Sequence, residues 1–180
     1  MFLPGIRLGE PRQFPQQDLP PETYTDLRRQ TVGVHISLAM GERIGGFEVP
    51  ALAWSSSLLA QLRGITIDHT ILVNEVVSLE KEEAAGEPNL ILSLMRHHGL
   101  ARTAAIDDMI GQADALAQRF FDLQNTIPQL CQALALTPPE RSAVQRFVAL
   151  MRALIRGNYD WSRAAGRYTP TAKPLTAGPT

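Results

Sequence analysis

The sequence has very little cysteine, no long apolar run and no excess of either charge, and each shortage excludes a class of protein. Cys131 is the only cysteine, so no intrachain disulfide can form, and a reducing cytoplasm suits the chain. We interpret Cys131 as a buried structural thiol rather than a nucleophile. No apolar run approaches the roughly 18 residues of a membrane span, and residues 1–15 lack the apolar core of a signal peptide.

Positive and negative charges nearly balance. The 17 Lys and Arg residues face 18 Asp and Glu residues, which gives a formal net charge of −1. No global field therefore attracts nucleic acid or an anionic membrane, and neither is predicted as a partner. With 180 residues, of which 44% are hydrophobic, the chain suits one globular domain.

Prolines gather at both ends and set the predicted domain limits. Because proline removes a backbone donor and fixes φ, residues 1–21 are predicted as an irregular segment and residues 169–180 as a disordered tail. The domain between them, residues 22–168, has helical spacing of apolar residues and no strand alternation. The predicted fold class is therefore all-α.

Turn formers separate the predicted helices. Gly86 and Pro88 are expected to end the longest one, and Thr137, Pro138 and Glu140 have the spacing of a capping box that starts the last one. We expect helices at about 22–40 (with Gly33 as a weak point), 55–84, 89–99, 103–125 and 138–166, a loop at 41–50, and a short helix or loop after Pro128.

The stretch NEVVSLEKE, residues 74–82, carries oxygen-bearing side chains at spacings of four. On a helix, Asn74, Ser78 and Glu82 share one face and form a stripe roughly 12 Å long. An amide, a hydroxyl and a carboxylate are oxygen donors of the kind that Mg²⁺ prefers. The competing interpretation is an ordinary solvated face, but the apolar neighbours of Asn74 predict that this residue is partly buried.

Towards the start of the helix the same stripe continues as Ile67, Thr70 and Ile71. The face is therefore apolar at one end and polar at the other. A metal-bound head group with a hydrocarbon tail would fit such a face, so these three residues are predicted to line a cavity.

The stretch NEVVSLEKE resembles the metal-binding motif of bacterial class I terpene synthases, written (N/D)DxxSxxKE. The resemblance implies that Asn74, Ser78 and Glu82 are Mg²⁺ ligands. It also implies that Lys81, at the basic eighth position, lies near the substrate diphosphate. Glu75 replaces the usual Asp at the second position, which is not among the three ligands.

A segment near the C-terminus, RGNYDWSRAAGRY (156–168), is similar to the closing helix of the same family. The resemblance implies that Arg167 and Tyr168 bind the diphosphate and that Trp161 lines the cavity. Arginine suits this role because its planar fork bonds phosphate oxygens in pairs.

An upstream segment, PPETYTDLRRQTVG (20–33), looks like the family pattern YxxLRRxTxG. By this resemblance Arg28, which lies 46 residues before Asn74, senses the diphosphate. A helix break around Thr31, Val32 and Gly33 would carry the sensing to the tail of the substrate, so the resemblance also implies that Thr31 and Val32 line the cavity. Arg29 is open to two interpretations, a second contact or a plain salt-bridge partner.

The family's second metal-binding wall, an aspartate-rich motif on an earlier helix, has no counterpart before residue 74. The stretch DDMIG (107–111) lacks the final acid and follows the motif of residues 74–82. The chain therefore resembles the C-terminal half of the class I terpenoid synthase helical bundle. The missing helices would leave apolar cavity surface without cover.

By this resemblance the function is that of a lyase, the Mg²⁺-dependent cyclisation of an isoprenyl diphosphate, with farnesyl diphosphate expected as the substrate. The family site holds three Mg²⁺ ions, of which this half would bind one, and no catalytic residue is assigned. The first alternative is a non-catalytic remnant that binds diphosphate and Mg²⁺, or a half that pairs with a separate N-terminal half or a second copy. The second is a plain helical interaction module. We expect little or no cyclase activity from the chain alone.

Overall fold

The computed structural model describes residues 19–164, and this part of the chain contains only α-helices and their connections. The all-α prediction is confirmed. The helices are α1 (Pro21–Thr31), α2 (Val34–Gly45), α3 (Ala51–Trp54), α4 (Ser57–Ala85), α5 (Leu90–His98), α6 (Arg102–Gln124), α7 (Ile127–Ala133) and α8 (Pro138–Ala164).

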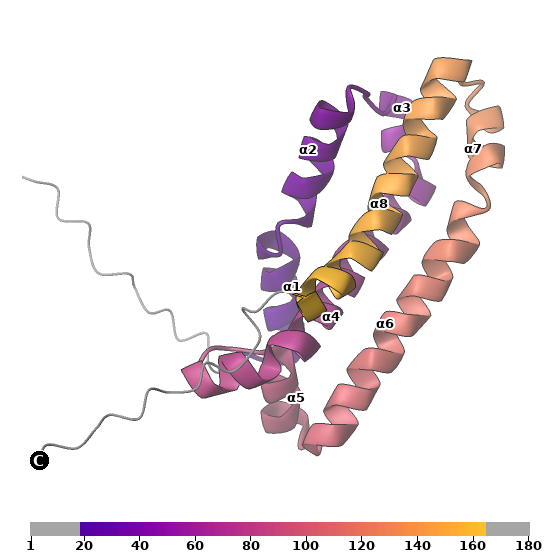
Figure 1. The fold of residues 1–180 in the computed structure, drawn as a ribbon. Helices are drawn as coiled ribbons and strands as arrows, with labels where there is room; N and C mark the ends of the chain where they lie inside the picture. The colour runs from indigo at the N-terminus through magenta and orange to yellow at the C-terminus, as the bar shows by residue number, and fades with distance from the viewer. Residues whose placement is uncertain (1–18, 165–180) are drawn as a thin grey trace, which may run out of the picture.

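The central element is α4, which packs against α1, α2, α3, α5, α6 and α8. Its 29 residues extend over about 43 Å, and the long helices α6 and α8 run beside it (Figure 1). Ser56 caps the start of α4, because its hydroxyl oxygen accepts a hydrogen bond of 3.3 Å from the Leu59 amide. Gly86 ends the helix with a φ of 68°, a left-handed conformation that suits glycine.

Two hydrophobic clusters hold the bundle together, one at each half of α4. The first joins α4 to α2, α6, α7 and α8 and includes Leu62, Phe120, Phe147 and Met151. The second joins α4 to α1, α5 and α6 and includes Tyr24, Leu79, Ile91 and Met109. The predicted metal motif lies on the half of α4 that the second cluster surrounds.

The predicted helix at 22–40 is two helices, because Gly33 interrupts it. Gly33 has a φ of 81°, a left-handed conformation that costs other residues roughly 1–2 kcal/mol. The weak point predicted at Gly33 is therefore a complete break, and the predicted break near Thr31 and Val32 is confirmed.

The predicted loop at 41–50 is wrong in its first half, because α2 continues to Gly45. Gly41 is the first residue of the predicted loop, but it lies where α2 packs against α8. A Cβ atom added there would overlap the Leu150 side chain. The glycine therefore permits a close approach of two helices. The short α3 was not predicted.

The capping box at the start of α8 is confirmed in part. The Glu140 carboxylate accepts hydrogen bonds of 2.8 Å from the Thr137 amide and 2.7 Å from the Thr137 hydroxyl. These bonds favour the charged form and hold the pKa of Glu140 below its usual value. Cys131 is buried as predicted, and burial raises the pKa of its thiol.

None of the helices in residues 19–164 is long and apolar enough to cross a membrane.

Candidate metal and diphosphate site

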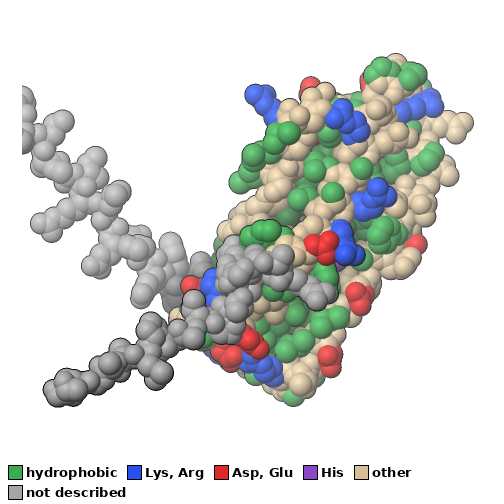
Figure 2. Space-filling model, in the orientation of Figure 1, with side chains coloured by type: hydrophobic (Ala, Val, Ile, Leu, Met, Phe, Trp, Pro, Cys, Tyr) green, Lys and Arg blue, Asp and Glu red, His purple; other side chains and the backbone are tan. Residues whose placement is uncertain are grey.

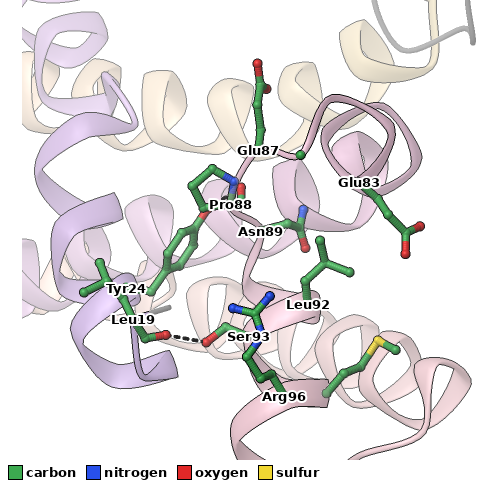
Figure 3. A pocket seen from close by; sticks show the side chains of 11 residues that line it. Leu19, Tyr24, Glu83, Glu87, Pro88, Asn89, Leu92, Ser93 and Arg96 are labelled. Atoms are coloured by element: carbon green, nitrogen blue, oxygen red, sulfur yellow. Dashed lines mark hydrogen bonds between the residues drawn. The ribbon is translucent and has the colours of Figure 1, made fainter. Parts of the chain in front are cut away.

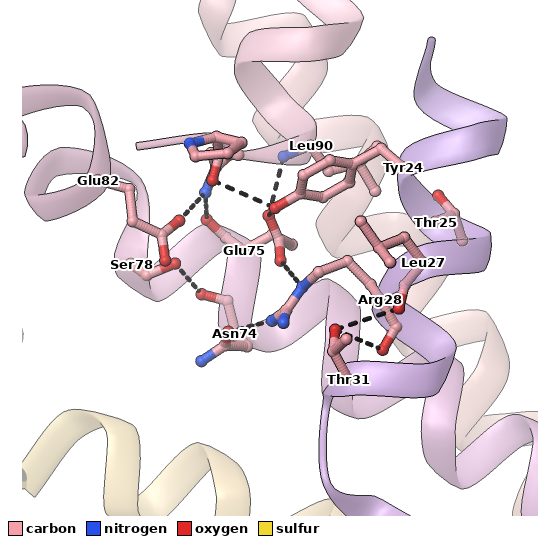
Figure 4. Close-up of polar contacts among 12 residues, drawn as sticks. Tyr24, Thr25, Leu27, Arg28, Thr31, Asn74, Glu75, Ser78, Glu82 and Leu90 are labelled. Carbon is pink, nitrogen blue, oxygen red and sulfur yellow. Dashed lines mark hydrogen bonds and ion pairs between the residues drawn. The ribbon is translucent and has the colours of Figure 1, made fainter. Parts of the chain in front are cut away.

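The predicted metal-ligand triad of Asn74, Ser78 and Glu82 follows one side of α4 over consecutive turns (Figure 4). Ser78 is only 1% exposed, whereas Asn74 and Glu82 are half-buried. The prediction that Asn74 is partly buried is confirmed. An ordinary solvated face is excluded, because each of these side chains has a specific partner within the protein.

Arg28 reaches from α1 to the first residue of the triad. Its Nη2 donates a hydrogen bond of 2.7 Å to the Asn74 side-chain oxygen. Its Nε donates a second bond of 2.7 Å to Oε1 of Glu75. The structure therefore brings together two segments that the sequence links only through the family resemblance.

Glu75 was missed as a site residue in the sequence, yet it is the centre of this group. Its side chain is 1% exposed. Its Oε2 accepts hydrogen bonds of 3.0 Å from the Tyr24 hydroxyl and 2.8 Å from the Leu90 amide. The available signal was its position between Leu72 and Leu79, which share its side of the helix and are buried.

Burial dominates the electrostatics of this group. It raises the pKa of the Glu75 carboxyl, while the Arg28 guanidinium and the Leu90 amide oppose the rise. The pKa of the Tyr24 hydroxyl is also raised, first by burial and then by the neighbouring Glu75 charge. Tyr24 therefore stays protonated and donates its hydrogen to Glu75.

Asn89 fixes the other end of the triad. It caps α5, because its side-chain oxygen accepts a hydrogen bond of 2.8 Å from the Ile91 amide. Its Nδ2 donates bonds of 2.8 Å to the Glu75 carbonyl oxygen and to Oε2 of Glu82. Asn89 was missed as a site residue in the sequence. Its position between Pro88 and an apolar run is a signal for a helix cap, but no local signal reveals its contact with the triad.

The donor set of the triad fits a divalent cation that prefers oxygen ligands. The Ser78 hydroxyl donates its hydrogen to the Asn74 carbonyl at 2.7 Å, which leaves the lone pairs of its oxygen available. The side-chain oxygens of Asn74 and Glu82 also keep lone pairs beyond the bonds they accept. No cluster of three or more His, Cys, Asp or Glu that could hold a metal occurs within residues 19–164. The candidate metal site is therefore the mixed set of amide, hydroxyl and carboxylate oxygens on Asn74, Ser78 and Glu82.

Among the remaining predicted diphosphate residues, the structure describes only Lys81. Lys81 is exposed on α4, one residue from Glu82. Arg167 and Tyr168 lie outside the described residues. Arg29, which was open to two interpretations, is a salt-bridge partner: its Nε lies 2.7 Å from Oδ1 of Asp68.

The predicted cavity residues differ in burial within residues 19–164. Ile67 and Ile71 are buried in the first hydrophobic cluster, and Val32 packs against it. The Thr70 hydroxyl is buried, with no hydrogen-bond partner among the described residues. The two remaining members of the set, Thr31 and Trp161, are exposed. Their role as cavity lining stays a prediction.

A cavity of about 490 Å³ lies beside this group, where α5 meets α1 and the connection from α4 (Figure 3). Tyr24 and Asn89 line it, and the Ser93 hydroxyl closes one side by donating a bond of 2.7 Å to the Leu19 carbonyl. Its lining includes no side chain of the triad. The cavity is therefore a neighbour of the candidate site and not the site itself.

Apolar side chains remain exposed on the surface of the bundle (Figure 2). On α2 they follow a spacing of four, since Ile36 is 67% exposed, Met40 54% and Ile44 82%. This stripe agrees with the expectation that the chain leaves apolar surface uncovered.

The fold and the candidate site together define an all-α domain whose central helix carries a stripe of partly buried, oxygen-bearing side chains. Residues 15–119 match the family described as terpene synthase family 2, C-terminal metal binding. The chain belongs to this family. The matched range contains Arg28 and the whole triad, but not Trp161, Arg167 or Tyr168.

Named relatives support the same assignment. The chain is 35% identical over 147 residues to pentalenene synthase from Streptomyces exfoliatus, which covers 81% of the chain and 44% of that protein. It is 36% identical over 160 residues to R-linalool synthase from Streptomyces clavuligerus, covering 89% of the chain and 48% of the relative. The chain spans about half the length of the curated relatives it matches.

Solved structures agree with the sequence relatives. Linalool/nerolidol synthase from Streptomyces clavuligerus matches with a TM-score of 0.76 at 34% identity, covering 81% of this chain and 50% of that one. An α-eudesmol synthase matches with a TM-score of 0.76 at 34% identity, covering 84% and 48%. The bundle therefore corresponds to about half of a terpene synthase.

Proposed function

We propose that this chain provides the diphosphate-sensing and metal-binding half of a Mg²⁺-dependent class I terpene cyclase, with farnesyl diphosphate as the substrate. The observation that carries the proposal is the hydrogen bond of 2.7 Å between Arg28 and Asn74. This bond directly links Arg28, the arginine that is expected to contact the diphosphate, to Asn74, the first expected metal ligand. One relative, from Streptomyces viridochromogenes, is named as cyclising farnesyl diphosphate and is 36% identical over 155 residues.

In this proposal the oxygen-bearing side chains bind the metal ion and the positively charged arginine binds the diphosphate. Asn74, Ser78 and Glu82 hold one Mg²⁺ ion of the three in a complete site, and the Arg28 guanidinium binds diphosphate oxygens. When bound, Mg²⁺ supplies Lewis-acid stabilisation of the departing diphosphate. Arg28 adds a fixed positive charge where negative charge develops, which is the electrostatic part of the task.

The alternative is a non-catalytic half that binds Mg²⁺ and diphosphate, with or without a partner. The sequence has no aspartate-rich motif before residue 74, so we expect the chain alone to bind pyrophosphate and to show little or no cyclisation. Robust Mg²⁺-dependent terpene formation by the purified chain would contradict this expectation and favour a complete enzyme.

Calorimetric titration of the purified chain with inorganic pyrophosphate, with and without Mg²⁺, tests the proposal. We expect binding that requires Mg²⁺. Glu82→Gln removes the one carboxylate of the triad and should weaken this binding about tenfold or more. Glu80→Gln is the matched control, since Glu80 is exposed on the same helix two residues away. Equal effects of the two substitutions, or no binding by the wild-type chain, would refute the site.

A further inference from the structure

A buried carboxylate joins three segments at the candidate site. Glu75 is the residue that departs from the usual motif, and both oxygens of its side chain accept hydrogen bonds. Oε1 receives Arg28 Nε at 2.7 Å, and Oε2 receives the Tyr24 hydroxyl and the Leu90 amide. These donors come from α1 and from the start of α5, whereas Glu75 lies on α4.

We propose that Glu75 is a positioning residue, whose carboxylate holds the Arg28 side chain in the orientation that places Nη2 on Asn74. The inference rests on the proposed function, because it assigns a residue that prepares the diphosphate-sensing arginine. Glu75 itself contacts neither metal nor diphosphate in this account. It acts through Arg28.

Because the Arg28 guanidinium is planar, the orientation that Glu75 imposes at Nε also sets the orientation of Nη2. Nε and Nη2 belong to one rigid, flat group with fixed directions for its hydrogens. When Glu75 holds Nε, the direction of Nη2 is set within narrow limits, and Nη2 donates to Asn74 at 2.7 Å. A lysine at position 28 would have a single rotatable ammonium and could not pass on this constraint.

The position of the carboxylate is itself fixed from the opposite side. The Leu90 amide belongs to the first turn of α5, and the Tyr24 hydroxyl oxygen, whose hydrogen points to Glu75, lies 3.2 Å from the Pro88 carbonyl oxygen. Because Glu75 is 1% exposed, water does not compete for these bonds. The guanidinium, by contrast, is only partly buried, since the Arg28 side chain is 22% exposed. Arg28 is thus anchored at Nε and open to a ligand at its outer end.

The main chain of Glu75 also connects to Glu82, the last expected metal ligand, through Asn89. The Glu75 carbonyl accepts from Asn89, and the same Asn89 amide group donates to Glu82 at 2.8 Å. Glu75 therefore lies between both ends of the triad, with its side chain directed towards Asn74 through Arg28 and its carbonyl towards Glu82 through Asn89. A substitution of the side chain removes the first of these two connections directly and keeps the carbonyl oxygen that accepts from Asn89.

The test compares Glu75→Gln with Tyr24→Phe in the full chain. Glu75→Gln keeps the shape but removes the charge that Arg28 Nε faces. Tyr24→Phe removes one hydrogen bond from the same carboxylate and leaves the Arg28 contact in place. Two properties are measured, namely the NMR signal of the Arg28 Nε–H, assigned by its absence in Arg28→Lys, and pyrophosphate binding with Mg²⁺ by calorimetry.

We expect a slowly exchanging Arg28 Nε–H in the wild-type chain. Glu75→Gln should remove its protection and weaken pyrophosphate binding about tenfold or more. Tyr24→Phe should retain the protected signal and change the affinity by less than about threefold. If Glu75 had only a structural role, Glu75→Gln and Tyr24→Phe would weaken pyrophosphate binding equally. Retention of both the signal and the affinity in Glu75→Gln would overturn the proposal.

Failure of the proposed function gives a different pattern. If the wild-type chain binds no pyrophosphate in the presence of Mg²⁺, that function fails, and the Arg28 Nε–H signal alone decides whether Glu75 holds Arg28. If Glu75→Gln does not fold, the proposal is tested instead on the wild-type chain, by following the Arg28 Nε–H signal during titration with pyrophosphate and Mg²⁺. The Nε–H should stay protected in the bound state, and its loss on binding, or its absence before binding, would overturn the proposal.

Discussion

Arg28 and Arg29 are consecutive residues of α1, but their guanidinium groups have different partners on α4. Arg28 turns to Glu75 and Asn74. Arg29 forms a two-point pair with Asp68, with bonds of 2.7 and 3.1 Å, and these bonds raise the pKa of its guanidinium. Only the first arginine is therefore available to the candidate site, although the sequence repeats the same residue.

This difference predicts unequal effects of two identical substitutions. Arg28→Ala should abolish measurable Mg²⁺-dependent pyrophosphate binding, because it removes the guanidinium and leaves the Glu75 charge buried and unpaired. Arg29→Ala should leave the binding unchanged and lower the free energy of unfolding by about 0.2–1 kcal/mol, since its pair with Asp68 is exposed. Calorimetry and urea denaturation measure the two effects, and equal loss of binding in both variants would contradict the assignment.

The glycine between α1 and α2 predicts a penalty for any side chain. Gly33→Ala should lower the free energy of unfolding by roughly 1–2 kcal/mol, because φ is 81° while a Cβ atom would meet no neighbour. Gly64→Ala, within α4 and equally uncrowded, should instead raise it by about 0.5–1 kcal/mol. Urea denaturation of both variants gives the two signs, and a stabilising Gly33→Ala would disprove the left-handed break.

Asn89 is predicted to stabilise the fold through two separable contributions. Asn89→Ala loses the cap of α5 and both bonds donated by Nδ2, so it should lower the free energy of unfolding by roughly 2–4 kcal/mol. Asn89→Ser keeps an oxygen for the cap but loses the bonds to Glu75 and Glu82. Chemical denaturation should place Asn89→Ser between wild type and Asn89→Ala. Equal stability of the two variants would mean that the cap contributes nothing.

His69 predicts that the protein loses stability as the pH falls. Its Nδ1 is buried, with no hydrogen-bond partner in residues 19–164. Burial lowers the pKa of the imidazole, opposed by the Asp114 charge. Below the unfolded-state pKa of about 6.5, the unfolded chain binds a proton that the folded chain does not, so the free energy of unfolding decreases towards acid.

The charged groups around His69 do not reverse this decrease of the free energy of unfolding towards acid pH. Asp114, Arg152, Arg156 and Tyr159 line the same groove between α4, α6 and α8. Urea denaturation between about pH 7.5 and 5.5 should show a slope of at most about 1.4 kcal/mol per pH unit from this residue. His69→Gln should flatten the curve. An unchanged curve in this variant would show that His69 titrates alike in both states.

Local sequence predicted much of the helical framework. Prolines and glycines ended the helices near their observed limits, and Gly86 and the Thr137–Glu140 pair adopt the expected caps. Gly41 was misjudged, because a glycine that ends a helix and a glycine that lets two helices approach are identical in sequence. Only the position of Leu150, on a helix more than a hundred residues later, distinguishes the two cases.

The sequence by itself determined that Asn74, Ser78 and Glu82 share one face, because helical periodicity is a local property of the chain. Tertiary structure decided which partners these residues have. The burial of Glu75, the reach of Arg28 and the bridge made by Asn89 all depend on how α1 and α5 pack against α4. The contact between Arg28 and Glu75 joins positions 47 residues apart, and no local spacing encodes it. The site was therefore visible as a stripe in the sequence, but its organising carboxylate appeared only in the fold.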